Sequence, residues 1–208
     1  MSDTLLPLLA AAFDARAGLL VRLHAEQTDA YRLFHGSVEG HPGLTVDRYG
    51  ELLLVQCFHS PLATQALAAL RAFYAERLPG LALVYNDRSQ ANSRIANPLP
   101  PEEIDAATLP RQMHEMGVAY RIVGRHAGQD PWLFLDLRAA RRRVMHEAPG
   151  KSLLNLFAYT CAFSVAAAVG GGLATSVDVS ARYLDWGKRN FALNGIDPAS
   201  HRFAKMDT

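Results

Sequence analysis

Cysteine is scarce in this chain of 208 residues, and its scarcity excludes two kinds of small protein. The two cysteines, Cys57 and Cys161, are too few for a disulfide framework and too far apart for a zinc-binding motif. The eight histidines are scattered and do not recur at the spacing of metal ligands. We therefore expect reduced thiols and no metal site.

The chain also lacks long hydrophobic runs and a strong net charge. The apolar stretch 5–12 is short and is interrupted by Pro7, which fits neither a signal peptide nor a membrane span. The formal net charge of +1 gives no overall attraction to nucleic acid, so any RNA contact must come from a local patch. We expect a cytoplasmic protein of one or two domains that makes no membrane contact.

What the chain does contain is an ordered alternation of apolar runs and helical patterns over residues 153–195. The run 153–156 is typical of an interior parallel strand that is covered on both faces. The alanine-rich segment 163–169 predicts a helix, and the glycines at 170–172 can adopt the positive φ with which helices end. The sequence therefore predicts a strand, a loop and a helix in succession.

A second strand and helix complete this pattern. Residues 174–179 predict the strand, and Ser180 is a good N-cap for a helix that places Leu184 and Phe191 on one face. Asn194–Gly195 then ends that helix. A right-handed crossover would bring the ends of both strands to the same edge of the sheet, where sheets of this kind bind ligands. The predicted fold class is α/β, with a Rossmann-like, doubly wound domain.

Asp178 falls at the predicted end of the second strand, 23 residues after Asn155 at the end of the first. A carboxylate at that position can accept hydrogen bonds from both hydroxyls of a ribose, although it could also serve only as a helix-capping acid. The first loop, 157–162, has no G-x-G-x-x-G pattern that would let a pyrophosphate approach the backbone. An adenosine cofactor without phosphates fits better, and S-adenosyl-L-methionine is the common one.

These residues resemble the class I S-adenosylmethionine-dependent methyltransferases that modify bases of bacterial large-subunit ribosomal RNA. The motifs that carry the resemblance are Phe134–Arg138 with Arg141, Asn155–Thr160, Val177–Ser180, and Trp186–Asn190 continuing to Leu193–Gly195. Upstream, Gly43–Gly50 is similar to the central domain of this family, so the resemblance covers residues 35–208. It implies a Rossmann-like class I methyltransferase domain that is incomplete at its C-terminus and is preceded by a small α+β domain.

The resemblance also implies a set of cofactor-binding residues. This set is Arg138, Asn155, Phe157, Ala158, Tyr159, Thr160, Asp178, Val179, Ser180 and Asp207. Asn155 either binds the amino group of the methionine part or braces the loop, and Phe157 and Tyr159 either contact the cofactor or only pack the loop wall. Asp207, after a short strand at 201–206, can accept a hydrogen bond from the adenine amino group.

No catalytic residue is assigned within the chain. The family places a proline-containing catalytic motif after the fourth strand of its sheet, and its 5-methylcytosine-forming members use a nucleophilic cysteine; neither lies in these residues. Cys161 stands where the family usually has glycine or another small residue, and we expect it to pack rather than to react. The resemblance therefore implies that this chain binds the cofactor but has no turnover by itself.

The sequence divides into two expected domains. Residues 1–110 form the small α+β domain with its linker, and residues 111–208 form the N-terminal half of the methyltransferase domain, beginning with a half-exposed strand at 118–122. The first domain is expected to contain an amphipathic opening helix, a hairpin of 44–48 and 52–57, a helix at 63–78 and a strand at 81–85. The proline-containing stretch 86–111 is interpreted as the linker.

A basic helix is expected at 136–147, with Asp136 as its N-cap. Its buried stripe would consist of Leu137, Ala140 and Val144. Another face would gather Arg138, Arg141 and Arg142. These arginines either neutralise RNA phosphates or form a solvated face with salt bridges. The resemblance implies that Arg138 points at the cofactor edge.

The leading hypothesis is an S-adenosylmethionine-dependent methyltransferase that acts on RNA, specifically on a base of 23S ribosomal RNA. One alternative is a noncatalytic RNA-binding module that uses the arginine helix, and another is an NAD-dependent oxidoreductase, which the missing glycines disfavour. Because a short sheet leaves an open edge and apolar faces, we also expect a homo-oligomer or a partner chain that completes the sheet.

Overall fold

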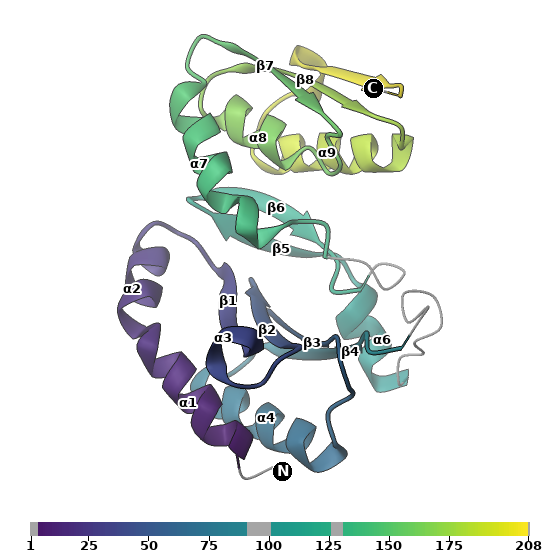
Figure 1. Ribbon diagram of the computed structural model, residues 1–208. Helices are drawn as coiled ribbons and strands as arrows, with labels where there is room; N and C mark the ends of the chain where they lie inside the picture. Colours follow the sequence, from purple (N-terminus) through teal and green to yellow (C-terminus); the bar gives the residue numbers. More distant parts are fainter. Residues whose placement is uncertain (1–3, 91–100, 126–130, 208) are drawn as a thin grey trace. The chain divides into compact units, whose positions relative to one another are not determined.

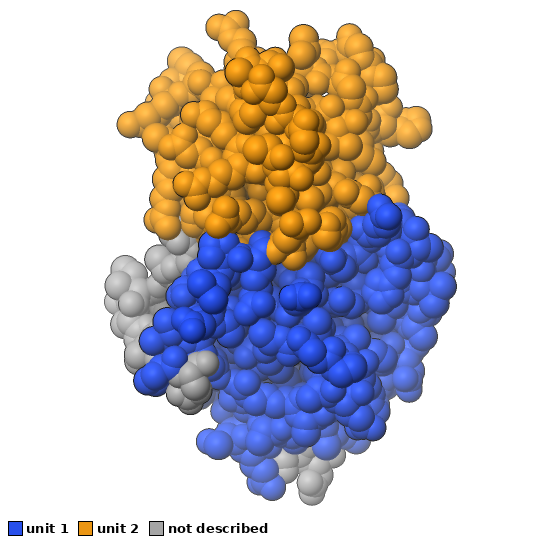
Figure 2. Space-filling view, turned by 180° about the vertical axis from the view of Figure 1, so that it is seen from behind, with its two compact units in different colours: residues 1–111, 123–131 blue, residues 112–122, 132–208 orange. Residues whose placement is uncertain are grey.

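The chain forms two compact units, shown in different colours in Figure 2. The first unit comprises residues 1–111 and 123–131, and the second comprises residues 112–122 and 132–208. The computed structural model describes residues 4–90, 101–125 and 131–207 (Figure 1). Across these three ranges, no helix combines the length and the apolar character that crossing a membrane requires.

The first unit is built on a four-stranded sheet with the strand order β1-β2-β3-β4. Its strands are β1 (Ala30–His35), β2 (Leu44–Tyr49), β3 (Leu52–Cys57) and β4 (Ala82–Asp87). β1 to β3 are antiparallel neighbours, and β4 runs parallel to β3. The predicted hairpin is confirmed as β2 and β3, and Gly50 in its turn has a φ of 60° that glycine tolerates.

Five helices of the first unit are described. They are α1 (Leu5–Ala15), α2 (Ala17–Ala25), α3 (Gly36–Glu39), α4 (Thr64–Arg77) and α6 (Pro101–Thr108). α1 and α4 supply Leu9, Leu70 and Tyr74 to a core completed by strand residues such as Leu33. α6 lies inside the segment predicted as a linker. Its proline is the first helical residue, a position where proline is compatible with a helix.

The second unit contains a parallel sheet with the strand order β7-β8-β9. Its strands are β7 (Ser152–Leu156), β8 (Leu173–Asp178) and β9 (Arg202–Lys205). The connections contain α8 (Ala162–Val169), α9 (Ala181–Leu193) and a 3-10 turn, η3 (Pro198–Ser200). The predicted succession of strand, helix, strand and helix is confirmed. Since the strands are parallel, their carboxyl ends meet at one edge of the sheet.

The caps predicted for α9 are also confirmed. The Ser180 hydroxyl accepts a hydrogen bond from the backbone N–H of Tyr183 at 3.4 Å, as an N-cap residue does. Leu184 and Phe191 are buried on the same side of the helix. The helix ends at Leu193, with Asn194 as its C-cap residue and Gly195 after it at a φ of 70°.

β7 lies at the edge of this sheet, so the prediction of an interior strand covered on both faces is wrong for the described residues. Leu154 and Leu156 are 62% and 46% exposed, and Leu173 on β8 is 59% exposed. α8 and α9 both lie on one side of this sheet, and neither helix covers the other side (Figure 1). A continuous apolar run indicates a strand that favours burial, but it carries no information about which segment covers each face.

The strands β5 (Arg111–Glu115) and β6 (Val118–Ile122) form a two-stranded ribbon. Apart from Arg111, this ribbon belongs to the second unit. β6 was expected to be half-exposed, yet only Arg121 of its residues is not buried. Asn190 of α9 and Asn194, its C-cap residue, bond to the β6 backbone: Asn190 accepts from the N–H of Arg121 at 2.9 Å, and Asn194 both accepts from and donates to Ala119. These side chains satisfy strand groups that would otherwise need a neighbouring strand.

α7 (Arg138–Glu147) follows a 3-10 turn, η2 (Leu135–Leu137), and begins without a side-chain cap. Its N-cap residue is Leu137, so the predicted cap by Asp136 is wrong. The predicted apolar stripe is also wrong, because Leu137 and Ala140 are exposed and Val144 is half-buried. The buried residue of this helix is Arg141, which is 1% exposed.

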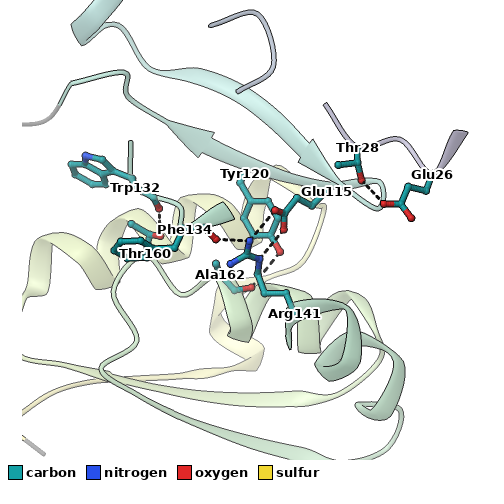
Figure 3. A network of polar contacts seen from close by, with 9 residues as sticks. All are labelled: Glu26, Thr28, Glu115, Tyr120, Trp132, Phe134, Arg141, Thr160 and Ala162. Atoms are coloured by element: carbon teal, nitrogen blue, oxygen red, sulfur yellow. Dashed lines mark hydrogen bonds and ion pairs between the residues drawn. The ribbon is translucent and has the colours of Figure 1, made fainter. Parts of the chain in front are cut away.

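Arg141 is buried because an acid on β5 neutralises it. Its Nε and Nη2 donate to the two carboxylate oxygens of Glu115 at 2.7 and 2.8 Å, and Nη2 also donates to the Phe134 carbonyl at 2.8 Å (Figure 3). Beside this pair, burial and then the Glu115 charge raise the pKa of Tyr120 above its ordinary value. The surface cluster predicted for Arg138, Arg141 and Arg142 therefore does not include Arg141.

Replacing Glu115 by glutamine tests the importance of this pair. Glu115→Gln leaves the Arg141 guanidinium buried without its counter-charge, which costs about 3–5 kcal/mol of unfolding free energy. Urea denaturation followed by circular dichroism measures this loss. Arg143→Gln is the control, because it breaks the exposed Arg143–Glu147 pair and is expected to change stability little. Equal stabilities of the two variants would contradict the assignment.

Candidate functional site

Asp178 links the two loops that follow β7 and β8. Its Oδ2 accepts a hydrogen bond from the backbone N–H of Tyr159 at 2.8 Å, and its Oδ1 accepts one from the N–H of Ser180 at 2.8 Å. The backbone N–H of Met206, just after β9, donates to the Asp178 carbonyl at 3.2 Å. Each carboxylate oxygen has a further lone pair, so the half-buried side chain can accept bonds from a ligand as well.

The loop after β7 has an unusual backbone. Phe157, Tyr159 and Cys161 have φ values of 53°, 50° and 60°, in the left-handed region that normally favours glycine. Such conformations cost on the order of 1–3 kcal/mol each and persist only when the surrounding structure holds them. Here the Ala158 N–H donates to the Val177 carbonyl at 2.9 Å, and the Tyr159 N–H donates to Asp178. The loop is therefore fixed by β8.

A cavity of about 170 Å³ lies along this loop. Its lining is Leu133, Phe134, Leu137, Arg141, Asn155, Leu156, Phe157, Ala158, Tyr159, Thr160, Ala162 and Phe163. The structure thus brings five of the predicted residues together around this cavity. They are Asn155, Phe157, Ala158, Tyr159 and Thr160. Most of the lining is apolar, with a few polar groups, as in many small-molecule sites.

The aromatic rings of Phe134 and Tyr159 line this cavity, and the ring of Tyr183 packs against Tyr159. The ring centre of Tyr159 lies 5.6 Å from that of Phe134 and 4.6 Å from that of Tyr183. Neither Phe134 nor Tyr183 was among the predicted site residues. Phe134 could have been found from its place in the motif that precedes α7, whereas Tyr183 gave no sequence signal beyond its position on a helix.

Two predicted residues form side-chain hydrogen bonds with neighbouring segments, Asn155 with α8 and Thr160 with Trp132. The Asn155 amide donates to the Ser164 hydroxyl at 2.9 Å, and the buried Ser176 hydroxyl donates to the same oxygen at 2.8 Å. The hydroxyl of Thr160 donates to the Trp132 carbonyl at 2.6 Å. The side-chain contact of Asn155 is with α8, so its two interpretations, as a ligand of the methionine part and as a brace of the loop, both stay predictions.

The remaining predicted residues lie near the strand ends without lining the cavity. Val179, which is exposed, and Ser180 directly follow Asp178. Arg138 is half-buried at the start of α7, next to a cavity-lining residue, and Asp207 is exposed just after β9. Their contact with a cofactor stays a prediction.

Cys161 does not have the properties of a nucleophile. Its side chain is fully buried, and burial raises the pKa of its thiol to about 12. Its Sγ donates to the carbonyl of Tyr159 at 3.7 Å. In the described part of the chain, no group of three or more histidine, cysteine or acidic residues is placed to hold a metal ion.

Gly187 allows α9 to pack directly against this cysteine. A Cβ at position 187 would lie 2.4 Å from the Sγ of Cys161 and 2.7 Å from its Cβ. The next helical turn is joined to the same loop, because the Asn190 amide donates to the Thr160 carbonyl at 3.1 Å. The loop is thus held between β8 and α9.

Gly187→Ala is therefore expected to destabilise the chain by about 1–3 kcal/mol through overpacking. Alanine's better helix propensity, worth about 1 kcal/mol, acts in the opposite direction, so a net loss points to the contact. Cys161→Gly in the same chain should restore stability, because it removes both contacting atoms and suits the positive φ. Denaturation of the four proteins of this cycle measures the coupling, and additive effects would contradict it.

Comparison with known proteins places this site in a family. A family model described as S-adenosylmethionine-dependent methyltransferase matches residues 31–206. Ribosomal RNA large subunit methyltransferase K/L of Shewanella frigidimarina is 34% identical over 190 residues, 88% of this chain and 26% of that protein. A ribosomal RNA large subunit methyltransferase of Deinococcus radiodurans is 35% identical over 205 residues, 96% of this chain and 50% of that protein.

Solved structures give the same result. A crystal structure of a methyltransferase complexed with S-adenosylhomocysteine has a TM-score of 0.80 at 30% identity and covers 100% of this chain and 52% of its own. An S-adenosylmethionine-dependent methyltransferase from Streptococcus mutans has a TM-score of 0.79 at 29% identity. The match covers 99% of this chain and 52% of the Streptococcus mutans chain. The chain thus spans about a quarter of the Shewanella relative and about half of the other three.

The match of the family model extends over both units and includes the loop, Asp178 and β9. It confirms the resemblance that the sequence motifs indicated. The chain belongs to the family of S-adenosylmethionine-dependent methyltransferases.

Proposed function

We propose that this chain binds S-adenosyl-L-methionine at the carboxyl edge of β7 and β8, and that the protein methylates RNA, at a base of 23S ribosomal RNA. The observation that carries the proposal is the Asp178 carboxylate, fixed by two backbone N–H groups beside a cavity lined by the loop. The relatives named as ribosomal RNA methyltransferases, and the S-adenosylhomocysteine in a similar structure, support it. They do not favour an oxidoreductase or a noncatalytic RNA-binding module.

The residues present fit the cofactor. Asp178 has lone pairs for the ribose hydroxyls, and the exposed Asp207 follows the strand that bonds to Asp178. Ring faces of Phe134 and Tyr159 favour a positively charged sulfonium near the cavity. The remaining proposed contacts are Arg138, Asn155, Phe157, Ala158, Thr160, Val179 and Ser180.

Methyl transfer depends more on position than on covalent help from the protein. The cofactor supplies an electrophilic methyl group on a sulfonium sulfur. The chain's own residues hold the donor: Asp178 orients the ribose, and the rigid loop with Phe134 and Tyr159 shields the reacting end from water. The acceptor is an unpaired or flipped RNA base, because a paired base hides its reactive edge.

Binding of S-adenosylhomocysteine to Asp178→Ala is the test of this proposal. The variant loses a charged acceptor, which is worth about 1.5–3 kcal/mol and corresponds to at least tenfold weaker binding in calorimetric titration. Asp185→Ala is the matched control, because Asp185 is an exposed acid of α9 whose partner is Lys188. Unchanged affinity of Asp178→Ala, or no binding by the folded wild-type chain, would refute the cofactor site.

Further proposals concern domains and location. Residues 1–110 would form a small α+β domain with a linker, and residues 111–208 the N-terminal half of the methyltransferase domain. The four-stranded sheet of the first unit and the parallel sheet of the second support this division. A cytoplasmic location is supported by the free thiols of Cys57 and Cys161.

We also propose that the chain forms a homo-oligomer in which a second copy meets the incomplete edge of the parallel sheet at β7 and covers the exposed apolar residues beside it. Leu154, Leu156 and Leu173 share this exposure, and apolar surface of this kind favours association. Sedimentation velocity over a range of concentrations is expected to show a dimer that Leu154→Ser weakens. Val38→Ser, at an exposed valine of the other unit, should not change the dimer. A wild-type monomer at every concentration would rule the proposal out.

A further inference from the structure

Three arginine side chains of the second unit are stacked on a pair of tryptophans. The guanidinium carbon of Arg121 lies 5.3 Å from the centre of the Trp186 ring, and that of Arg189 lies 5.9 Å from it. The guanidinium of Arg182 lies 5.2 Å from the centre of the Trp132 ring. The two indole rings are themselves 4.0 Å apart, so the three cations surround one aromatic pair.

The arginines, and not the rings, face solvent in this cluster. Trp132 and Trp186 are 2% and 8% exposed, whereas Arg182 and Arg189 are exposed and Arg121 is half-buried. The indole N–H of Trp186 donates to the Arg121 carbonyl at 2.8 Å, which fixes the ring against β6. The guanidinium groups are therefore held in place by rings that are themselves fixed.

The positive charges of Arg121 and Arg189 are not cancelled by the acid of α9. Asp185 forms its ion pair with Lys188 at 2.9 Å. Over the described ranges of the chain, neither Arg121 nor Arg189 forms an ion pair with an acid. The cluster is thus a local basic patch in a chain with a formal net charge of only +1.

The patch adjoins the proposed cofactor edge. Arg182 is the second residue of α9, four positions after Asp178. Ring contacts continue from the patch to the loop: Trp132 lies 5.8 Å from Tyr183, and Tyr183 lies 4.6 Å from Tyr159. A polymer bound along the patch would therefore pass beside the cavity-lining loop.

We propose that Arg121, Arg182 and Arg189 form a contact surface for the sugar-phosphate backbone of the RNA substrate, on the single-stranded segment next to the modified base. This inference rests on the proposed function. Guanidinium groups bind phosphate oxygens through two parallel N–H donors, and stacking on a ring leaves those donors directed outward. The contact would position the RNA without reading its sequence.

The test compares two triple variants that lose the same charge. R121Q/R182Q/R189Q removes the patch. R22Q/R77Q/R143Q removes three arginines of α2, α4 and α7, including Arg77, which is also stacked on a ring, that of Phe73. Polarisation of a fluorescent single-stranded RNA is measured from low to high salt. Each lost phosphate contact should reduce the slope of log affinity against log salt by about 0.7.

We expect the patch variant to bind RNA at least tenfold more weakly at low salt with a smaller slope, and the control to remain within twofold of wild type. Equal affinities and slopes for the two variants would overturn the proposal. If the patch variant fails to fold, the exposed Arg189→Gln alone should reduce the slope by about 0.7. An unchanged slope in that single variant would also overturn it.

Binding of S-adenosylhomocysteine separates this inference from the proposed function. The patch variant should bind it as wild type does, because none of the three arginines is assigned to the cofactor. A wild-type chain that binds S-adenosylhomocysteine but no RNA would refute the patch and leave the cofactor site standing. Normal RNA binding without any cofactor binding would refute the proposed cofactor site instead.

Discussion

The structure of the site depends on the carboxylate of Asp178. Its two oxygens accept hydrogen bonds from the backbone of two segments, the loop after β7 and the start of α9. Through Tyr159 it holds the loop after β7, and through Ser180 it holds the start of α9. This arrangement places the carboxylate that we propose as the ribose acceptor next to the cavity before any ligand arrives. Preorganisation of this kind reduces the entropy that binding would otherwise cost.

The loop compensates for its lack of glycine by tertiary contacts. Three non-glycine residues have left-handed backbones, and β8, Trp132 and α9 each hold part of the loop. The glycine that the geometry requires is on the helix, at Gly187, where it leaves room for Cys161. The rigidity of the loop thus comes from packing against neighbouring elements rather than from its own sequence. A rigid loop can hold a donor group in a fixed position relative to its acceptor.

Periodicity and capping rules predicted the elements that are local in sequence. The order β7-α8-β8-α9, the Ser180 cap and the place of Asp178 all follow from residues within a few positions of each other. The burial of Arg141 depends on Glu115, 26 positions earlier on another element, and no local pattern contains that information. The positive φ values at Phe157, Tyr159 and Cys161 were missed for the same reason, because only their tertiary contacts permit them.

The most direct measurement of the central claim changes the ligand rather than the protein. The affinity of wild-type chain for S-adenosylhomocysteine is compared with its affinity for the analogue that lacks both ribose hydroxyls. If Asp178 accepts hydrogen bonds from these hydroxyls, the analogue binds at least tenfold more weakly, as expected for the loss of bonds to a charged group worth about 1.5–3 kcal/mol. Equal affinities for the two ligands would contradict the account.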